Sequence, residues 1–177
     1  TIDGDREDPS VAFVAEDASP ELGSTYTMAI TANDAAAIAA ADVEIQAFSS
    51  FIDYWTDYTI VPSANYQLVG ESSAAPTLPI RFAVERKADA DPSLDDGTIA
   101  RIVVSVANNT PEGLAVTYRI DKGALTYTSP VEDEKFTSSF TGTINATVSS
   151  PFIITLDPMI VGSAGGNIIV TDAEGNP

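Results

Sequence analysis

Short runs rich in Val, Ile, Thr, Tyr and Phe, separated by Pro, Gly, Asn and Asp, occupy almost the whole chain. This texture is typical of an all-β protein, because β-branched and aromatic side chains favour strands and the separating residues favour turns. Eleven prolines spread over the 177 residues disfavour long helices. Strands are predicted at residues 10–15, 24–31, 42–48, 57–61, 77–85, 99–106, 114–120, 136–148, 151–156 and 167–171.

Several of these runs alternate between apolar and polar residues. In the run 24–31, Tyr26, Met28 and Ile30 fall on one face, which is the pattern of a strand with one side in a core. The run 114–120 alternates in the same way. One stretch differs, because the alanine-rich residues 34–42 favour a helix and predict a short helical turn between two strands.

Three pairs of segments resemble each other at an offset of about 74 residues. A repeat of this kind predicts two tandem immunoglobulin-like β-sandwich units, at residues 1–96 and 97–177. The alternative is a strand-and-turn rhythm that any two parts of a β-sandwich share. The pairs are 23–33 with 97–108, 42–46 with 115–119, and 78–82 with 151–155.

Composition excludes several classes of function. Lys plus Arg is 8 and Asp plus Glu is 26, so the net charge is 8 − 26 = −18, which repels nucleic acid and anionic lipids. The chain has no Cys and no His, which excludes disulfides, thiolate or imidazole metal sites and Ser-His-Asp triads. No apolar run approaches the roughly 20 residues that span a bilayer. No catalytic motif is present, so we predict a protein that is not an enzyme.

Short motifs resemble the Calx-β repeat, an immunoglobulin-like sandwich family of extracellular and surface proteins. Residues 9–13 followed by Glu-Leu-Gly at 21–23 are similar to the opening strand and turn of that family. Thr-Asp-Tyr-Thr at 56–59 is similar to its Asp-Tyr-Thr signature. The resemblance implies a β-sandwich in an extracellular or cell-surface location. Members of the family often hold calcium with an Asp-Asp pair directly after a strand, and here the equivalent strand ends in Glu85-Arg-Lys87, so the resemblance does not carry the calcium over at that position.

The loop at residues 89–97 contains four carboxylates: Asp89, Asp91, Asp95 and Asp96. Calcium favours clustered oxygen ligands, so these residues are candidates for a calcium site. The loop lacks the spacing of an EF-hand and its closing glutamate. The alternative is a solvated acidic turn between two strands.

An aromatic segment offers a second candidate site. Tyr54, Trp55 and Tyr58 stand beside Asp57, and such rings stack on sugars while carboxylates accept hydrogen bonds from sugar hydroxyls. Strand alternation places Tyr54 and Tyr58 on one face, with Trp55 and Asp57 on the other. The alternative is that these rings pack in the core.

Two segments match the Asn-x-Thr pattern of N-glycosylation, at Asn108-Asn-Thr110 and Asn145-Ala-Thr147. The pattern is common by chance in chains rich in Asn and Thr. It is consistent with secretion.

Taken together, these features predict a non-enzymatic extracellular structural or adhesive module. The partner is then another copy or a neighbouring surface protein. Residues 1–9 and 170–177 both combine an acidic turn with a proline, which suggests a fibre or surface-array subunit. Subunits would join head to tail by exchanging the strand at 10–15. The alternative function is a carbohydrate-binding module built on the aromatic segment.

Overall fold

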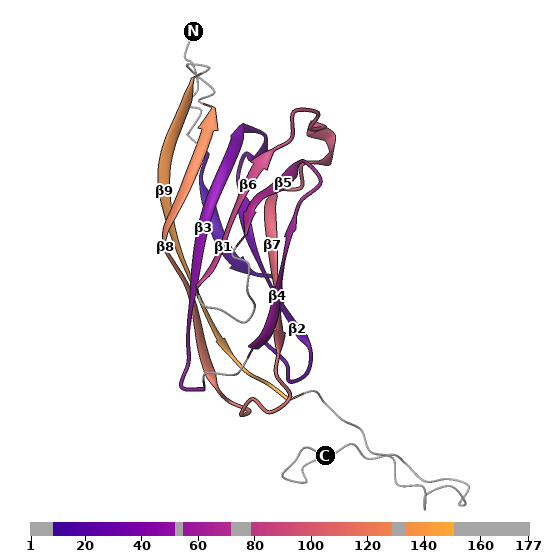
Figure 1. Cartoon of the computed structure of the whole chain (residues 1–177), viewed down its shortest axis with the longest axis vertical. Coiled ribbons are helices and arrows are strands. Elements are labelled where there is room, and N and C mark those ends of the chain that lie inside the picture. The colour runs from indigo at the N-terminus through magenta and orange to yellow at the C-terminus, as the bar shows by residue number, and fades with distance from the viewer. Residues whose placement is uncertain (1–8, 52–54, 72–78, 129–133, 151–177) are drawn as a thin grey trace, which may run out of the picture.

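A computed structural model describes residues 9–51, 55–71, 79–128 and 134–150 (Figure 1). Within these ranges the chain is built almost entirely of β-strands. No helix in them is long and apolar enough to cross a membrane. The elements, in chain order, are β1 (Val11–Ala15), β2 (Thr25–Ala32), the 3-10 helix η1 (Ala35–Ala37), β3 (Ile38–Phe48), β4 (Trp55–Pro62), β5 (Tyr66–Glu71), β6 (Ile80–Arg86), the 3-10 helix η2 (Pro92–Leu94), β7 (Thr98–Val106), β8 (Ala115–Thr128) and β9 (Lys135–Thr147).

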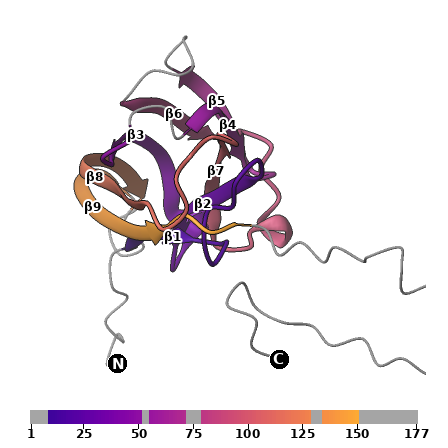
Figure 2. The same ribbon diagram turned by 90° about the horizontal axis from the view of Figure 1, so that it is seen from below.

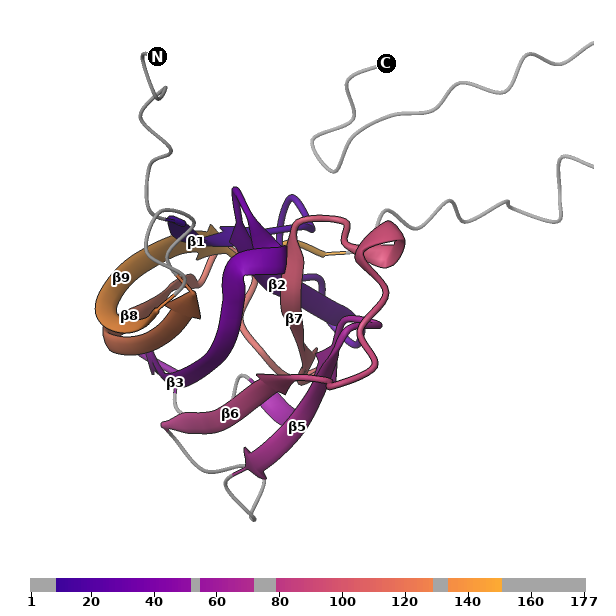
Figure 3. The same cartoon turned by 90° about the horizontal axis from the view of Figure 1, so that it is seen from above.

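The strands form two sheets that pack face to face. One sheet has the order β1-β2-β7-β4, and the other has the order β5-β6-β3-β8-β9. Neighbouring strands within each sheet are antiparallel. Figure 2 and Figure 3, which look along the long axis, show the sheets surrounding a common interior. The predicted all-β sandwich is therefore confirmed.

Alternating side chains from both sheets fill the space between them. Tyr26, Met28 and Ile30 of β2 are each at most 1% exposed, as their spacing predicted. Tyr26 stacks on Tyr118 of the opposite sheet with the ring centroids 5.9 Å apart. Burial raises the pKa of the Tyr118 phenol, so this ring stays neutral in the interior. The core is thus a single apolar layer shared by the two sheets.

The predicted division at residue 96 does not describe this arrangement. β7, which follows that boundary, lies between β2 and β4 in the centre of the four-stranded sheet. β8 likewise pairs with β3 in the other sheet. The described residues therefore form one sandwich, not two in series. In two of the three similar pairs the segments are adjacent strands, β2 with β7 and β3 with β8, which share a strand pattern because they share a sheet environment. Residues 151–155 of the third pair lie outside the described residues.

The alanine-rich stretch contains the predicted short helical turn between two strands, which is the three-residue η1 between β2 and β3. The turn is shorter than residues 34–42, because β3 begins directly after it at Ile38. Strand pairing on both sides of β3 outweighs the helix propensity of alanine here. β5 was not predicted, because it is a short edge strand interrupted by Gly70. The strands predicted at 151–156 and 167–171 lie outside the described residues.

The N-terminal strand belongs to its own sheet. β1 pairs antiparallel with β2, with Phe13 opposite Ile30. Phe13 is 7% exposed and lies in the core. Head-to-tail exchange would need this strand to leave its own core, so the described structure gives that mode of assembly no support.

Candidate functional site

The aromatic segment faces inward. Trp55 is 5% exposed and Tyr58 is 8% exposed, and both belong to the core. Simple alternation would put them on opposite faces, because they are three residues apart. The register between β4 and β7 shifts between Trp55 and Asp57, so β4 contains one extra residue there. This β-bulge turns both rings toward the interior.

The predicted glycan platform is therefore not assembled by these residues. The Trp55 and Tyr58 rings lie 5.6 Å apart and pack against each other within the core. Asp57 is exposed, and its Oδ1 accepts a hydrogen bond of 2.8 Å from the backbone N–H of Tyr58. Tyr54 lies outside the described residues. Stacking on a sugar needs an exposed ring face, which neither described ring presents.

One carboxylate of the acidic loop is bound inside a polar cluster formed by Arg86, Asp95, Asn65 and Tyr66, here called the Arg86 cluster. Arg86 donates from Nη1 and Nη2 to the two oxygens of Asp95, at 3.0 and 2.8 Å. Asn65 Nδ2 donates to Asp95 Oδ1 at 2.7 Å. The guanidinium lies over the ring of Tyr66, 5.7 Å from its centroid.

The Arg86 cluster is largely removed from solvent. The side chains of Arg86 and Asp95 are 16% and 13% exposed, and Asn65 is buried. The guanidinium holds the pKa of Asp95 below its ordinary value, and the Asn65 hydrogen bond acts in the same direction. Tyr66 Oη donates to the carbonyl of Ala35 at 2.6 Å. The cluster thus fastens the acidic loop to β5, β6 and η1.

The other three aspartates of the loop have separate positions. Asp91 accepts a hydrogen bond of 2.9 Å from a backbone N–H of η2, and Asp96 accepts one of 2.9 Å from Thr98. Hydrogen bonds from the side chain and the backbone of Ser93 lower the pKa of Asp91, and the backbone bond from Thr98 lowers the pKa of Asp96. Asp89 is exposed. Within the part of the chain that the structure describes, no three His, Cys, Asp or Glu side chains are grouped so as to hold a metal ion. The four predicted ligands therefore do not converge.

The outward side of the five-stranded sheet, here called the docking face, has small side chains at its centre. Asp42 of β3 stands in register with Ala83 of β6 and Ala124 of β8. Ala124 in turn lies opposite Ser139 of β9. Asp42, Ala124 and Ser139 are exposed. Small residues side by side on four strands give a face of low relief.

Two arginines on the docking face are paired with carboxylates of the same chain. Arg81 Nε lies 2.8 Å from Glu44 Oε2, and Arg119 Nη2 donates to Asp121 Oδ2 at 3.0 Å. The guanidinium of Arg119 also covers the ring of Phe48, 4.6 Å from its centroid. Phe48 is nevertheless 43% exposed. The sequence analysis missed this face, because its residues come together only through the register of strands far apart in the chain.

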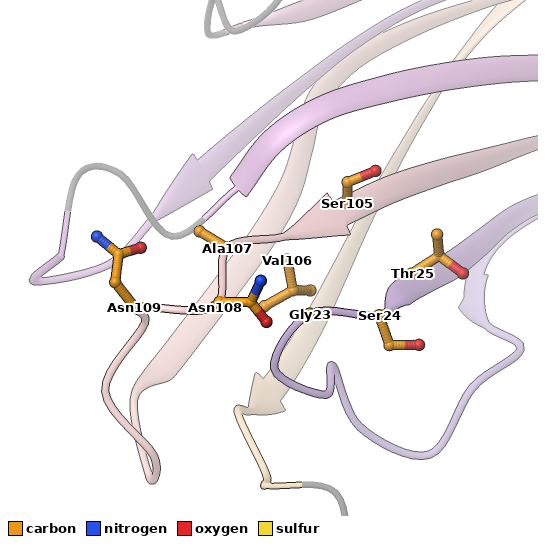
Figure 4. A pocket seen from close by; sticks show the side chains of 8 residues that line it. All are labelled: Gly23, Ser24, Thr25, Ser105, Val106, Ala107, Asn108 and Asn109. Carbon is orange, nitrogen blue, oxygen red and sulfur yellow. The ribbon is translucent and has the colours of Figure 1, made fainter.

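A shallow hollow of about 540 Å³ lies at one end of the four-stranded sheet (Figure 4). Gly23 has a φ of 69°, and a Cβ at this position would collide with the side-chain oxygen of Asn108. The lining offers hydroxyls, amides and apolar groups but no ionisable side chain, so it has no general acid or base. The lining residues are Gly23, Ser24, Thr25, Ser105, Val106, Ala107, Asn108 and Asn109.

Comparison with solved structures relates this sandwich to cohesin modules. A cohesin module from a family 33 glycoside hydrolase of Clostridium perfringens matches with a TM-score of 0.56 and 6% identity, over 81% of this chain and 100% of that one. The seventh ScaB type I cohesin of Pseudobacteroides cellulosolvens matches with a TM-score of 0.57 and 12% identity, over 83% and 96%. A type I cohesin–dockerin complex from Clostridium thermocellum matches with a TM-score of 0.50 and 10% identity, over 80% and 99%.

These matches establish the fold and nothing finer, because the sequence identities are low. No family model matches the chain, and no curated protein matches it. The resemblance to Calx-β repeats remains an observation on short sequence motifs. The fold of this chain is an all-β sandwich of the kind found in cohesin modules.

Proposed function

We propose that this chain is a non-catalytic extracellular module that binds a partner protein through its docking face. The observation that carries this proposal is the likeness to cohesin modules over 96–100% of their length. One of those structures is a complex of a cohesin with a dockerin. A fold alone does not define a function, so the docking face has to supply the rest of the argument.

The shape and charge of the docking face support protein recognition. A face with low relief at Ala83, Asp42 and Ala124 can approach a partner's surface closely. The partly exposed ring of Phe48, under the guanidinium of Arg119, provides an aromatic and cationic contact point. Aromatic and Arg side chains are the types that most often dominate binding energy at protein interfaces.

Other features agree with a role outside the cell and without catalysis. The net charge of −18 favours solubility in salty surroundings, and it disfavours nucleic acid as a partner. The hollow at Gly23 and Asn108 is lined without ionisable side chains. Adhesion and scaffolding are both uses of a binding module of this type.

The proposal is tested with the purified chain immobilised as bait against proteins secreted by its own source. Ala124→Arg places a long cation in the middle of the docking face. Thr59→Arg makes the same addition at an exposed position of β4, in the other sheet. We expect the wild type and Thr59→Arg to retain the same partner and Ala124→Arg to lose it, with affinities then measured by calorimetry. Equal retention by all three proteins, or loss from both variants, would contradict the proposed face.

A further inference from the structure

The two Asn-x-Thr segments have very different environments in the folded chain. N-glycosylation attaches an oligosaccharide to the asparagine side chain and requires a Ser or Thr hydroxyl two residues later. Both side chains must therefore be accessible, and the folded product must have room for the sugar. These requirements separate the segment at Asn108 from the segment at Asn145.

The segment at Asn108 is poorly suited. Thr110 is only 3% exposed, and its backbone N–H donates to the carbonyl of Ala107 at 3.1 Å within a turn. The side chain of Asn108 lies across Gly23 at the hollow, as Figure 4 shows. Thus Asn108 itself is exposed, but the residue that must supply the hydroxyl in this segment is buried.

The segment at Asn145 is open. Asn145 and Thr147 are both exposed on β9, while Ala146 between them is partly buried. Thr117 of the neighbouring strand donates from Oγ1 to Asn145 Oδ1 at 2.9 Å. This bond engages the oxygen of the amide and leaves Nδ2, the atom that carries the sugar, on the opposite side of the group.

The surroundings of Asn145 also favour a bulky polar attachment. The chain has 26 acidic residues, yet none lies between residues 135 and 147. The outward positions of β9 are small or medium-sized, uncharged and exposed, so they leave space beside the asparagine. These positions are Thr137, Ser139, Thr141, Thr143, Asn145 and Thr147.

We infer that Asn145 carries an N-linked oligosaccharide and that Asn108 does not. The donor is an oligosaccharide linked through phosphate to a polyprenyl lipid. Nδ2 of Asn145 forms a bond to the anomeric carbon while the bond from that carbon to the phosphate oxygen breaks. The lipid phosphate leaves with the electron pair, and the amide nitrogen loses one proton. The inference rests on the extracellular location in the proposed function and adds a modification to it.

The test uses the full chain secreted from its own cells, with intact mass and glycopeptide mapping. We expect an added oligosaccharide on the peptide that contains Asn145, and its complete loss in Asn145→Gln. Thr147→Ala keeps the asparagine but should also lose the sugar, whereas Thr147→Ser should keep it. Asn108→Gln should leave the mass of the sugar unchanged. Thr147→Ser is the control, because it changes the same residue but keeps the hydroxyl. Glycosylation that is retained in this variant would show that its loss in Thr147→Ala comes from the missing hydroxyl and not from misfolding.

Three results would overturn the inference: no sugar on Asn145, a sugar on Asn108, or a sugar that survives Thr147→Ala. Partner binding is a separate measurement. Asn145 stands in register with Thr117, which is itself in register with Phe48, so Asn145 lies on the docking face. Partner binding is therefore tested with Ala124→Arg and not with Asn145→Gln. The binding result for Ala124→Arg tests only the proposed function, and the glycosylation of Asn145 is judged separately from the mass measurements.

Discussion

The pair Trp55 and Tyr58 and the Arg86 cluster both contain residues that the sequence analysis proposed as ligands, Trp55 and Tyr58 for a glycan and Asp95 for calcium. In the structure these residues serve the fold itself. The two rings are buried by a β-bulge among apolar neighbours. In the cluster, Arg86 and Asp95 are held by opposite charge and hydrogen bonds. The first region is stabilised by removing apolar area from water, and the second by pairing groups that water would otherwise solvate.

Because of this difference, the stability contributed by the two regions should depend differently on pH. Burial of aromatic area does not depend on the ionisation of a side chain, so it is insensitive to pH. The Arg86 cluster depends on Asp95 being charged, so it weakens when that carboxylate takes up a proton. Prominent aromatic or acidic residues therefore do not identify a binding site until their burial and partners are known.

Removal of the tryptophan should have the largest effect. Trp55→Ala deletes a core ring and leaves a cavity, so we expect unfolding to become easier by about 3–5 kcal/mol. Urea denaturation followed by circular dichroism measures this loss. Phe48→Ala is the matched control, because that ring is 43% exposed and should contribute less than about 1 kcal/mol to stability. Similar losses in the two variants would mean that Trp55 is not part of the core.

Breaking the Arg86 cluster should have an intermediate effect. Arg86→Ala leaves the Asp95 carboxylate without its main partner in a site largely removed from water, and we expect a loss of about 1.5–3 kcal/mol. The pair Arg81 and Glu44 is more exposed, at 62% and 37%, so Arg81→Ala should lose less than about 1 kcal/mol. If Arg81→Ala lost more stability than Arg86→Ala, the Arg86 cluster would not be what stabilises the acidic loop.

The pH dependence should separate the two regions. Because the folded-state pKa of Asp95 is lowered, its stabilisation is fully present above the ordinary aspartate value of about 3.9 and is lost as pH falls through the folded-state pKa. The stability difference between wild type and Asp95→Asn should therefore shrink over that acidic range. The difference between wild type and Trp55→Ala should stay constant while both remain folded. Urea denaturation at a series of pH values measures both stability differences. A difference for Asp95→Asn that stays constant with pH would mean that the charge of Asp95 does not stabilise the Arg86 cluster.

The smallest effect is expected from divalent ions. The carboxylates of Asp91, Asp95 and Asp96 already accept hydrogen bonds within the chain, so added calcium should act on this loop mainly by screening charge. Calcium and magnesium at equal ionic strength should then raise the melting temperature by the same small amount. A clearly larger rise in melting temperature with calcium than with magnesium would show that the loop binds calcium specifically.

Much of the architecture could be predicted because strand alternation is a local property. The spacing of Tyr26, Met28 and Ile30 alone placed them in the core. The short helical turn before β3 was also predicted, but the start of β3 at Ile38 and the short β5 could not be predicted, because pairing with neighbouring strands decides them. Of the candidate site residues, Trp55 was proposed for glycan binding and Asp95 for calcium, and their inward positions could not be predicted because they depend on partners distant in the chain.

The sequence by itself determined the β-rich class, the alternation that builds the core, the strongly acidic surface and the absence of cysteine and histidine chemistry. These are properties of composition and of neighbouring residues. Only the tertiary structure decided that β7 lies between β2 and β4, that a bulge buries Trp55, and that Asp95 binds Arg86. It also decided which asparagine segment is open, at Asn145, and which hydroxyl is hidden, at Thr110. Register and pairing join residues that are far apart in the chain, so no local pattern specifies them.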